Sequence, residues 1–451
     1  MSQWKKVKIG DFLKRKRIPV VLDETAKYKL LTVRLYHKGI VLREEKLGAL
    51  IKSNMFKVSK GDFILSGIDA RNGAFGIVPE ELDGAVVTND FWYFDIDESI
   101  IKREYFLWLT TTPIFLDACQ KASKGETQRI RLQKEAFFNY EINCPTIDYQ
   151  DEFLSTIASV IDNINELKKE TEKQTELVKQ LRASILQDAI EGKLTADWRE
   201  KHPVKKGDPD YDAEALFEKI QAEKQEKGKK QKHLPAITEN EKPFAIPTNW
   251  KWVRLGDAAE ILGGYAYKSH LFKEEGNNLV LRLGNIRTGY LRYEASPAFV
   301  SEDIAKDTAS YKILKNDIIV TMTGTRGKRD YLYTLLIDAN HVSKYNMFLN
   351  QRLANIRSLY SPKYVYDVLQ NDVLKEPIFE SATGSANQAN IGMPALQKWA
   401  IPYPPLAEQN EIAARVEKHL ETITQLENQI ASRETLTKQL MQGLLKDAFE
   451  E

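Results

Sequence analysis

Cysteine is nearly absent from this sequence, in which Cys119 and Cys144 are the only two among 451 residues. Two cysteines exclude a disulfide scaffold and a cysteine-rich metal site, and they fit a reducing cytoplasm. The six histidines show no H-E-x-x-H or similar metal spacing. We therefore expect a cytoplasmic protein that binds no metal or other cofactor itself.

Long apolar runs and excess charge are absent as well. No stretch approaches the ~18 apolar residues of a membrane span, and charged residues interrupt the opening MSQWKKVKIGD too often for a signal peptide. Lysine and arginine number 65 against 64 acidic residues, which gives a net charge of +1. The chain is therefore not a uniformly basic DNA-coating protein, and any nucleic-acid surface on it must be a local patch.

Signatures of catalysis are also missing. The sequence contains no Asn-Pro-Pro-Tyr/Phe or Asp-Pro-Pro-Tyr tetrapeptide of the amino-methyltransferase kind. GTRGK, from Gly324, has the wrong spacing for a phosphate-binding G-x-x-x-x-G-K-[ST] loop. These absences agree with a binding role and make an enzyme the weakest hypothesis.

What the sequence does contain is an internal repeat. WKKVKIGD, from Trp4, recurs as WKWVRLGD from Trp250, and KQLRASILQDA, from Lys179, recurs as KQLMQGLLKDA from Lys438. The offset between the copies grows from 246 (250 − 4) to 259 (438 − 179), so insertions must lie in loops of the second copy. Such a pseudo-dimer suits a target with two half-sites, and duplex DNA is the commonest target of that kind.

Each copy consists of a globular block followed by a long helix. Short β-rich runs alternate with Gly, Pro and Asn in the blocks, and one helix is expected near residues 102–120. We predict a mixed α/β (α+β) fold with two similar globular DNA-recognition domains, separated by two long helices that form an antiparallel coiled coil with pseudo-two-fold symmetry. The predicted segments are a first domain at 1–149, a first helix at 150–194, a charged linker at 195–248, a second domain at 249–405 and a second helix at 406–451.

The two long helices share one heptad register. Apolar residues recur at the a and d positions, although polar residues interrupt each seam near its middle. The predicted coiled-coil residues are Ile157, Ile164, Leu167, Val178, Leu181 and Ile185 in the first helix and Val416, Ile423, Leu426, Ile430, Leu440 and Leu444 in the second. The alternative is that each helix packs only on its own domain, but ~40 residues at ~1.5 Å each make a rod of roughly 60 Å.

The segment between the copies is rich in lysine and glutamate and includes QAEKQEKGKKQKH from Gln221. We expect a flexible connector with one short solvated helix over residues 212–227. Its charge run is interpreted as a solvated tether in preference to a DNA-binding arm.

Polar and basic residues gather at matching places in the two blocks. Sequence readout requires donors and acceptors at base edges, and cations position a protein on phosphates. The candidate DNA-binding residues of the first block are Arg34, Lys38, Arg71, Asn72, Lys124, Gln128, Arg129 and Arg131. Those of the second block are Arg282, Asn285, Arg287, Thr323, Thr325, Arg326, Lys328, Arg329, Asn387, Gln388 and Asn390. Each loop could instead be an ordinary turn with solvated charge, whereas Trp4 and Trp250 are interpreted as core anchors.

These motifs together resemble the specificity subunit of type I restriction-modification systems. The resemblance is carried by W-x-x-V-x-[IL]-G-D at the start of each block and by the segments ASKGETQ, from Ala122, and ATGSANQ, from Ala382. It continues in AIEGKLTADWR, from Ala189, in PFAIPTNWKWVRLGD, from Pro243, and in PYPPLAEQNEI, from Pro402. The first copy departs from the pattern because PTIDYQDEF replaces the Pro-Pro-Leu-x-x-Gln run and keeps only Pro145 and Gln150.

The resemblance implies a subunit without catalysis of its own, whose two domains each read one half of a bipartite asymmetric DNA target. It also implies docking of two methylation subunits on the helices, together with restriction/translocase subunits. S-adenosylmethionine, Mg and ATP are then expected on those partner subunits and not on this chain.

The helices are predicted to act as a ruler for the unread gap between the half-sites. A four-residue insertion near Thr175 would lengthen the helix by ~6 Å, or about two base pairs. Two rival hypotheses stay open: a specificity subunit of a different restriction system, and a coiled-coil adaptor that presents two binding modules without a DNA role.

Overall fold

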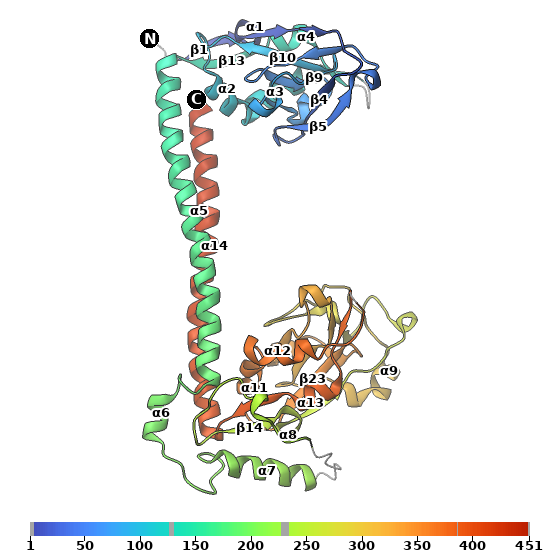
Figure 1. The fold of residues 1–451 in the computed structure, drawn as a ribbon, viewed down its shortest axis with the longest axis vertical. Helices are drawn as coiled ribbons and strands as arrows, with labels where there is room; N and C mark the ends of the chain where they lie inside the picture. The colour runs from blue at the N-terminus through green and yellow to red at the C-terminus, as the bar shows by residue number, and fades with distance from the viewer. Residues whose placement is uncertain (1–3, 126–129, 227–233, 386, 450–451) are drawn as a thin grey trace. The chain divides into compact units, whose positions relative to one another are not determined.

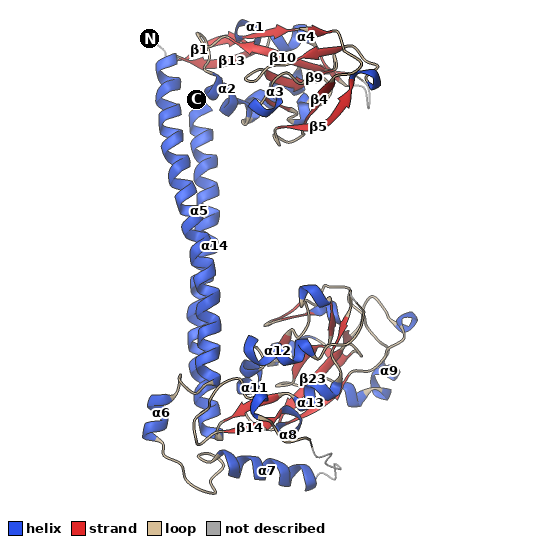
Figure 2. Cartoon of the chain, viewed as in Figure 1, coloured by secondary structure: helices blue, strands red, loops and turns tan. Residues whose placement is uncertain are grey.

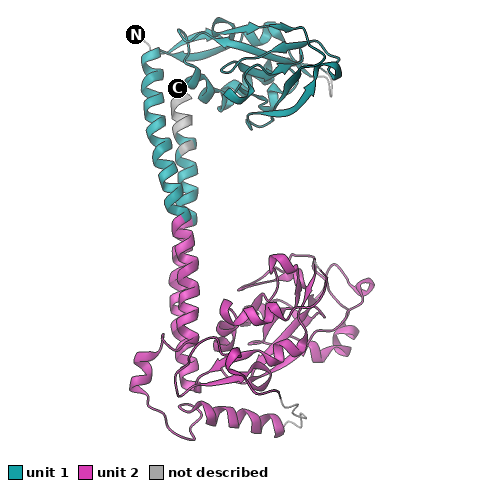
Figure 3. Cartoon of the chain, viewed as in Figure 1, with its two compact units in different colours: residues 1–172, 431–451 teal, residues 173–430 magenta. Residues whose placement is uncertain are grey.

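The computed structural model describes residues 4–125, 130–226, 234–385 and 387–449 (Figure 1). Helices and strands are mixed in both halves of the chain (Figure 2). The chain divides into two compact units: the first holds residues 1–172 and 431–451, and the second holds residues 173–430 (Figure 3). Each unit therefore contains one block and part of each long helix.

The first unit contains two larger sheets. A four-stranded sheet has the order β2-β10-β7-β8, and a five-stranded sheet has the order β3-β6-β9-β4-β5. The strands are β1 (Trp4–Lys8), β2 (Leu13–Lys16), β3 (Pro19–Val20), β4 (Lys27–Val33), β5 (Ile40–Leu47), β6 (Met55–Lys57), β7 (Phe63–Ser66), β8 (Phe75–Ile77), β9 (Val86–Val87), β10 (Phe91–Ile96), β11 (Ser123–Lys124), β12 (Arg131–Leu132) and β13 (Glu141–Pro145). The short helices are α1 (Ile9–Phe12), α2 (Arg103–Thr110), α3 (Pro113–Lys121) and α4 (Lys134–Phe138).

Aromatic side chains form the core of the first unit. The ring of Phe63, on the inner strand β7, lies 4.8 Å from that of Phe106 and 5.9 Å from that of Phe115, centroid to centroid. All three residues are fully buried. Two helices contribute to this core where the sequence predicts one, because Pro113 starts a new helix directly after Thr112.

The second unit repeats the four-stranded sheet in the order β15-β23-β19-β21. Its strands are β14 (Lys251–Arg254), β15 (Ala259–Gly263), β16 (Asn278–Leu281), β17 (Ile286–Arg287), β18 (Tyr290–Leu291), β19 (Ile318–Thr321), β20 (Thr323–Gly324), β21 (Thr334–Leu336), β22 (Asn346–Leu349), β23 (Leu353–Ser358), β24 (Ala389–Asn390) and β25 (Ala400–Tyr403). Its shorter helices are α6 (Ala196–Lys201), α7 (Ala213–Glu226), α8 (Leu255–Ala258), α9 (Glu302–Asp307), α10 (Ala339–Lys344), α11 (Pro362–Val368), α12 (Asp372–Glu380) and α13 (Met393–Lys398).

The two units share a scaffold and differ in what is added to it. β2, β10, β7 and β8 correspond in order to β15, β23, β19 and β21, and all neighbours within both sheets are antiparallel. The antiparallel pair β1–β13 likewise corresponds to β14–β25. The first unit adds its five-stranded sheet, whereas the second adds the parallel pair β16–β22 and the hairpin β17–β18. The predicted mixed fold with a duplicated domain is confirmed.

A glutamine joint repeats where each block passes into its long helix. Gln150 and Gln409 are both fully buried. The side-chain amide of Gln150 donates to the carbonyl of Pro145 at 3.0 Å, and that of Gln409 donates to the carbonyl of Pro404 at 2.8 Å. A buried amide must find such a partner, which explains why the first copy keeps this glutamine although most of the motif has changed.

The two long helices, α5 (Ile147–Ile190) and α14 (Leu406–Phe449), contain 44 residues each. In α5 the predicted a-position residues Ile157, Ile164, Val178 and Ile185 are buried, and so is Thr171, the polar residue that interrupts the a positions of this heptad register. The d-position leucines Leu167 and Leu181 are 41% and 45% exposed. In α14 Val416 and Ile423 are buried and Ile430 is half-buried, whereas Leu426 and Leu440 are exposed; the side chain of Leu444 lies outside the described part of the chain.

The helices run antiparallel within the second unit. Arg182 of α5 lies 3.4 Å from Glu427, whereas Leu194 and Asp197, beyond the C-terminal end of α5, accept hydrogen bonds from Arg415 at 2.9 and 2.6 Å. Moving from Arg182 toward the C-terminal end of α5, the partner in α14 changes from Glu427 to Arg415. The residue numbers of the two helices therefore run in opposite directions, as antiparallel pairing requires. Val178, Ile185, Val416 and Ile423 belong to the same buried cluster as the core of the second block.

Within the predicted linker at 195–248, the expectation of a solvated helix is wrong, whereas residues 227–233, which hold part of the charge run, lie outside the described residues. The predicted helix exists as α7, but its Leu216 and Ile220 are fully buried in the core of the second unit. The ammonium group of Lys224 donates to three backbone carbonyls, at 2.7, 2.8 and 3.2 Å. Apolar residues at i and i+4 give α7 a buried face that the surrounding charge run conceals.

A buried carboxylate joins three distant segments of the second unit. Glu408, near the start of α14, is fully buried and accepts hydrogen bonds from Thr195 at 2.8 Å and from the indole of Trp250 at 2.8 Å. Arg199 forms an ion pair with the same carboxylate. Trp250 is 7% exposed, so this repeated tryptophan is a core anchor and not a base-stacking residue.

Both cysteines are buried free thiols. Burial raises the pKa of Cys144 to about 11, which keeps its thiol protonated near neutral pH. Within the described residues no three His, Cys, Asp or Glu side chains form a group that could hold a metal ion. None of the described helices combines the length and the apolar character of a membrane span.

One buried carboxyl should make the stability of the second unit depend on pH. Asp367, on α11, is 3% exposed, and its Oδ2 atom has no hydrogen-bond partner. Burial raises the pKa of this carboxyl from 3.8 to about 8. The folded state therefore keeps a proton that the unfolded state releases, so this contribution to stability is full below about pH 4 and is lost as the pH rises toward 8.

We expect Asp367→Asn to remove this pH dependence and to raise the free energy of unfolding at the alkaline end by more than about 1 kcal/mol, because a buried amide cannot ionise. Urea unfolding at two pH values, one on each side of neutrality, measures the effect. The exposed Asp307→Asn should leave the pH profile unchanged. Parallel profiles for the wild type and Asp367→Asn would contradict the assignment.

Candidate nucleic-acid interface

The candidate interface of the second unit lies at one edge of its four-stranded sheet. β15 ends there at Gly263, which pairs with Ala354, and β19 ends there at Thr321, which pairs with Leu353. Because these neighbours are antiparallel, β23 and β21 both start at the same edge. Loops that are far apart in the sequence therefore meet along this edge.

Two of the predicted polar loops pair directly at this edge. The loop after β19 contains β20, which pairs with β24 of the Gly-rich segment through Thr323 opposite Asn390. The hydroxyl of Thr323 lies 3.2 Å from Oδ1 of Asn390. The guanidinium of Arg326 donates to the carbonyl of Ala382 at 2.9 Å, which adds a second bond between the loops. The exposed side chains of the pair include Arg326, Lys328, Asn387 and Gln388.

The middle of the edge is the turn Asn350–Arg352, which the candidate list omits. The backbone N–H of Gln351 donates to the carbonyl of Tyr265 at 2.9 Å, and the carbonyl of Arg352 accepts from Met322 at 3.0 Å. The side chains of Gln351 and Arg352 are exposed. The sequence signal was available, since three polar hydrogen-bonding residues directly follow the strand β22.

Glycine is required beside this turn. A Cβ atom at Gly264 would lie 2.0 Å from the carbonyl oxygen of Asn350, far inside contact distance. The loop after β15 can therefore approach the turn closely only because position 264 has no side chain.

Several predicted residues of the second block have partners inside the fold. Arg329 donates to both carboxylate oxygens of Glu376, at 2.7 and 2.6 Å, and lies over the ring of Phe379. Both side chains of this pair are about half exposed (53% and 45%), so a phosphate can replace the carboxylate here as well. Asn285 is fully buried, and its amide donates to two backbone carbonyls at 2.9 and 3.0 Å. Asn285 therefore shapes its loop and has no exposed surface that could reach a base.

The remaining predicted residues of the second block are partly engaged. Arg282 is exposed and lies over the ring of Phe272, and Arg287 is half-buried over the ring of Tyr333. Thr323 is 8% exposed. The backbone N–H of Thr325 donates to Asp330, a bond that closes the loop.

The first unit brings its predicted loops together in the same way. β7 ends at Ser66, which pairs with the first residue of β10, and β2 ends at the same edge. The turn between β4 and β5 lies against the loop after β7, because the N–H groups of Tyr36 and His37 donate to the carbonyls of Asn72 and Gly73 at 2.9 and 3.0 Å. The β11–β12 hairpin joins the same loop through the N–H of Leu132, which donates to the carbonyl of Gly67 at 2.8 Å.

The predicted side chains of the first block line this junction. Arg34, Lys38, Lys124 and Arg131 are exposed, and Arg71 and Asn72 are half-buried. Gln128 and Arg129 lie outside the described residues. Arg131 pairs with Asp90 at 2.8 Å, but both side chains are about half exposed (58% and 48%), so a phosphate can replace the carboxylate at little cost.

The sequence pattern does not single out an exposed aromatic residue that lies at this junction. Tyr36 is 69% exposed and has a positive φ of 59°, as does the next residue, His37, at 56°. Residues other than glycine adopt this conformation rarely, and such strain is concentrated at functional sites. Burial lowers the pKa of His37 below 6.5, so its ring is neutral near pH 7 and adds no charge to the junction.

A family model and the sequences of known proteins match this chain and agree on the same family. The family described as "Type I restriction modification DNA specificity domain" matches residues 1–177 and 247–433. The chain is 25% identical over 379 residues to the type I restriction enzyme EcoAI specificity subunit of Escherichia coli, an alignment that covers 72% of this chain and 61% of that protein. It is 24% identical to the EcoEI specificity subunit of the same organism, over 60% of this chain and 45% of that protein. The chain thus spans about half to three fifths of the length of these two relatives.

Two solved structures share the fold. One is the HsdS subunit from Thermoanaerobacter tengcongensis, with a TM-score of 0.54 at 17% identity and coverage of 100% of this chain and 97% of that one. The other is a chain from a study of complex assembly and conformational transition of the type I R-M system, with a TM-score of 0.60 at 16% identity and coverage of 100% and 98%.

Proposed function

Because the chain belongs to the family of type I restriction modification DNA specificity domains, we propose that it is the non-catalytic DNA-recognition subunit of a type I restriction-modification complex. Each globular block would read one half of a bipartite, asymmetric DNA target. The observation that carries this proposal is the convergence of separate polar loops on the same sheet edge in both units. A shared scaffold with different loops is what two different half-sites require.

The side chains proposed to contact DNA are exposed or half-buried polar residues at the two edges. In the second unit these are Arg326, Lys328, Asn387 and Gln388, to which we add Gln351 and Arg352. In the first unit they are Arg34, Lys38, Arg71, Asn72, Lys124 and Arg131. Arginine and lysine suit guanine edges and phosphates, and asparagine and glutamine suit adenine edges. Which bases they read follows from the geometry of a complex with DNA.

The five segments predicted from the sequence remain our proposal for the functional division of the chain. The long helices would set the unread spacer and dock two methylation subunits. Exposed leucines support docking within the second unit, where Leu177, Leu181 and Leu426 are 52%, 45% and 37% exposed. Restriction/translocase subunits would complete the assembly, and S-adenosylmethionine, Mg and ATP would be bound by the partner subunits.

Lengthening both helices should widen the unread spacer and leave the half-sites unchanged. The buried positions of α5 repeat every seven residues, so one whole heptad inserted in α5 and one in α14 preserve the seam. Seven residues add ~10.5 Å, about three base pairs at ~3.4 Å each. Methylation-site sequencing of the variant measures the gap, and an unchanged gap or altered half-sites would refute the ruler.

Salt dependence of DNA binding separates the proposed function from its rivals. A mobility-shift assay of the full chain with its methylation subunit should show sequence-selective binding that weakens steeply as the salt concentration rises. A coiled-coil adaptor without a DNA role would show no shift under any salt condition. Pull-down from the source cell distinguishes a type I partner from the enzyme of another restriction system.

A further inference from the structure

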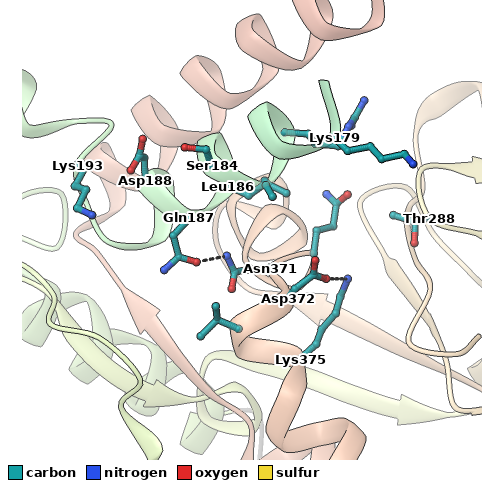
Figure 4. A pocket seen from close by; sticks show the side chains of 14 residues that line it. Lys179, Ser184, Leu186, Gln187, Asp188, Lys193, Thr288, Asn371, Asp372 and Lys375 are labelled. Atoms are coloured by element: carbon teal, nitrogen blue, oxygen red, sulfur yellow. Dashed lines mark hydrogen bonds and ion pairs between the residues drawn. The ribbon is translucent and has the colours of Figure 1, made fainter. Parts of the chain in front are cut away.

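The second unit contains a cavity of about 610 Å³ between the C-terminal part of α5 and the start of α12. Its lining includes four cations, Lys179, Arg182, Lys193 and Lys375, and two carboxylates, Asp188 and Asp372 (Figure 4). The lining residues alone carry two more positive than negative charges, but three of these cations also lie near Glu176, Glu191 and Glu427, which do not line the cavity. The attraction for an anion therefore depends on how weak these outer pairs are.

The cations are only loosely neutralised by neighbouring acids. Arg182 lies 3.4 Å from Glu427, Lys179 lies 3.8 Å from Glu176, and Lys375 lies 3.6 Å from Asp372. Lys193 has the closest acidic partner of the four, Glu191, and is therefore the least available to an added anion. Charge-assisted hydrogen bonds form at ~2.7–2.9 Å, so these three longer distances are not optimal hydrogen bonds. The N–H groups of Lys179, Arg182 and Lys375 can therefore bind an anion that comes closer.

Two polar groups in the cavity wall point to the same class of ligand. Figure 4 shows Asn371 bonded to Gln187 of α5, at 2.9 Å, where α12 begins. Asn371 caps the nine-residue helix α12 by accepting from Leu374, and helix N-termini favour anions. The buried amide nitrogen of Gln370, which also lines the cavity, has no hydrogen-bond partner.

The position of the cavity indicates where the anion comes from. Thr288 lines the cavity and belongs to the turn between β17 and β18. The next residue, Gly289, donates from its N–H to the carbonyl of Thr334 at 3.1 Å. Thr334 begins β21 at the sheet edge described above as the candidate interface. The β17–β18 turn thus connects the cavity wall to the proposed DNA-reading edge.

We propose that this cavity binds a phosphate of the duplex backbone next to the half-site read by the second unit. The inference rests on the proposed function. Lys179 and Arg182 supply the charge from α5, and the Gln370 amide and the start of α12 supply neutral donors. Such a contact fixes the position of the duplex against the helix and carries no sequence information.

The test uses the full chain, with its methylation subunit and a duplex that contains the target found by methylome sequencing. Lys179→Gln with Arg182→Gln is expected to lower the affinity for target and unrelated duplex alike, by roughly tenfold or more. The plot of log affinity against log salt concentration should become less steep by about one. Lys179→Gln alone, at a side chain 70% exposed, cannot disturb the fold and should show part of the same change.

Lys173→Gln is the matched control, because Lys173 is exposed on α5 and is displaced from Arg182 by nine residues, or about half a turn around the helix. It should leave the affinity and the salt slope unchanged. If the double variant binds DNA with the affinity and the salt dependence of the wild type, the phosphate site is refuted. The proposed function is not affected by that result.

Two further outcomes also overturn the phosphate site. An unchanged slope combined with loss of the methylation subunit would assign the cavity to an acidic group of that partner. A loss confined to one sequence would make it a base-reading site. Failure of the wild-type complex to bind DNA in any salt would instead refute the proposed function itself.

Discussion

Replacement of Arg326 and Arg352 by glutamine is expected to lower the affinity of the complex for its target by about 30-fold or more. Each of these exposed guanidinium groups lies at the sheet edge of the second unit, one in the loop after β19 and one in the turn before β23. Arginine that reads a guanine or holds a phosphate contributes ~1–3 kcal/mol, so two such losses add to a factor of roughly 30 to 10⁴. Fluorescence anisotropy with a labelled target duplex measures the change.

The matched control is the pair Lys205→Gln and Lys206→Gln. These exposed lysines belong to the same unit and lie in the segment between α6 and α7, away from the sheet edge. They remove the same formal charge, so they correct for the general attraction between a cation and DNA. Equal losses in both double variants would reduce the edge to a non-specific surface and contradict its assignment as a reading site.

Glu408→Ala is expected to lower the free energy of unfolding of the second unit strongly, because Glu408 is fully buried and joins three segments of the chain. The variant leaves Arg199, the hydroxyl of Thr195 and the indole N–H of Trp250 without their shared acceptor. Removing one partner of a buried ion pair costs about 3–5 kcal/mol, because the remaining charge stays buried without compensation. Urea unfolding followed by tryptophan fluorescence is suitable, since Trp250 lies at the affected joint.

Glu427→Ala provides the comparison. Glu427 is 46% exposed and lies 3.4 Å from Arg182, so its loss should cost less than about 1 kcal/mol. A similar small shift for both variants would mean that the joint at Glu408 does not hold the three segments together.

The buried contacts of Glu408 with Thr195, Arg199 and Trp250 explain why several of the motifs behind the family resemblance occur together. Thr195 and Arg199 come from AIEGKLTADWR, Trp250 from the repeated opening motif and Glu408 from the PYPPLAEQ run. These motifs meet at one buried carboxylate and not at the surfaces proposed to read DNA. These three motifs therefore report the scaffold, whereas the Gly-rich segments from Ala122 and Ala382 lie at the proposed DNA-reading edges.

The scaffold could be predicted from the sequence because it follows from local periodicity and repetition. Two copies of one motif require two copies of one sheet, and heptad spacing requires long helices. The a positions of α5 are buried as the heptad predicts. The exposed d-position leucines could not be predicted, because a heptad pattern does not say whether a second partner covers that side.

The composition of the site was less predictable, because loops are brought together by strand order and not by sequence distance. The turn at Gln351–Arg352 lies between the loops after β15 and β19 only because β23 pairs with both strands. Arg329 stays a predicted DNA contact, but the sequence does not show that Glu376, 47 residues away, pairs with it through both carboxylate oxygens. Charge alone likewise mispredicted the connector, whose buried leucine and isoleucine lie among exposed lysines and glutamates.

The most direct test of the central claim is methylome sequencing of a host that carries this subunit together with its methylation partner. The account predicts one bipartite motif, with two different half-sites separated by a gap of fixed length and free sequence. A continuous motif, or a palindrome with identical halves, would contradict recognition of a split site by two unlike domains on a duplicated scaffold.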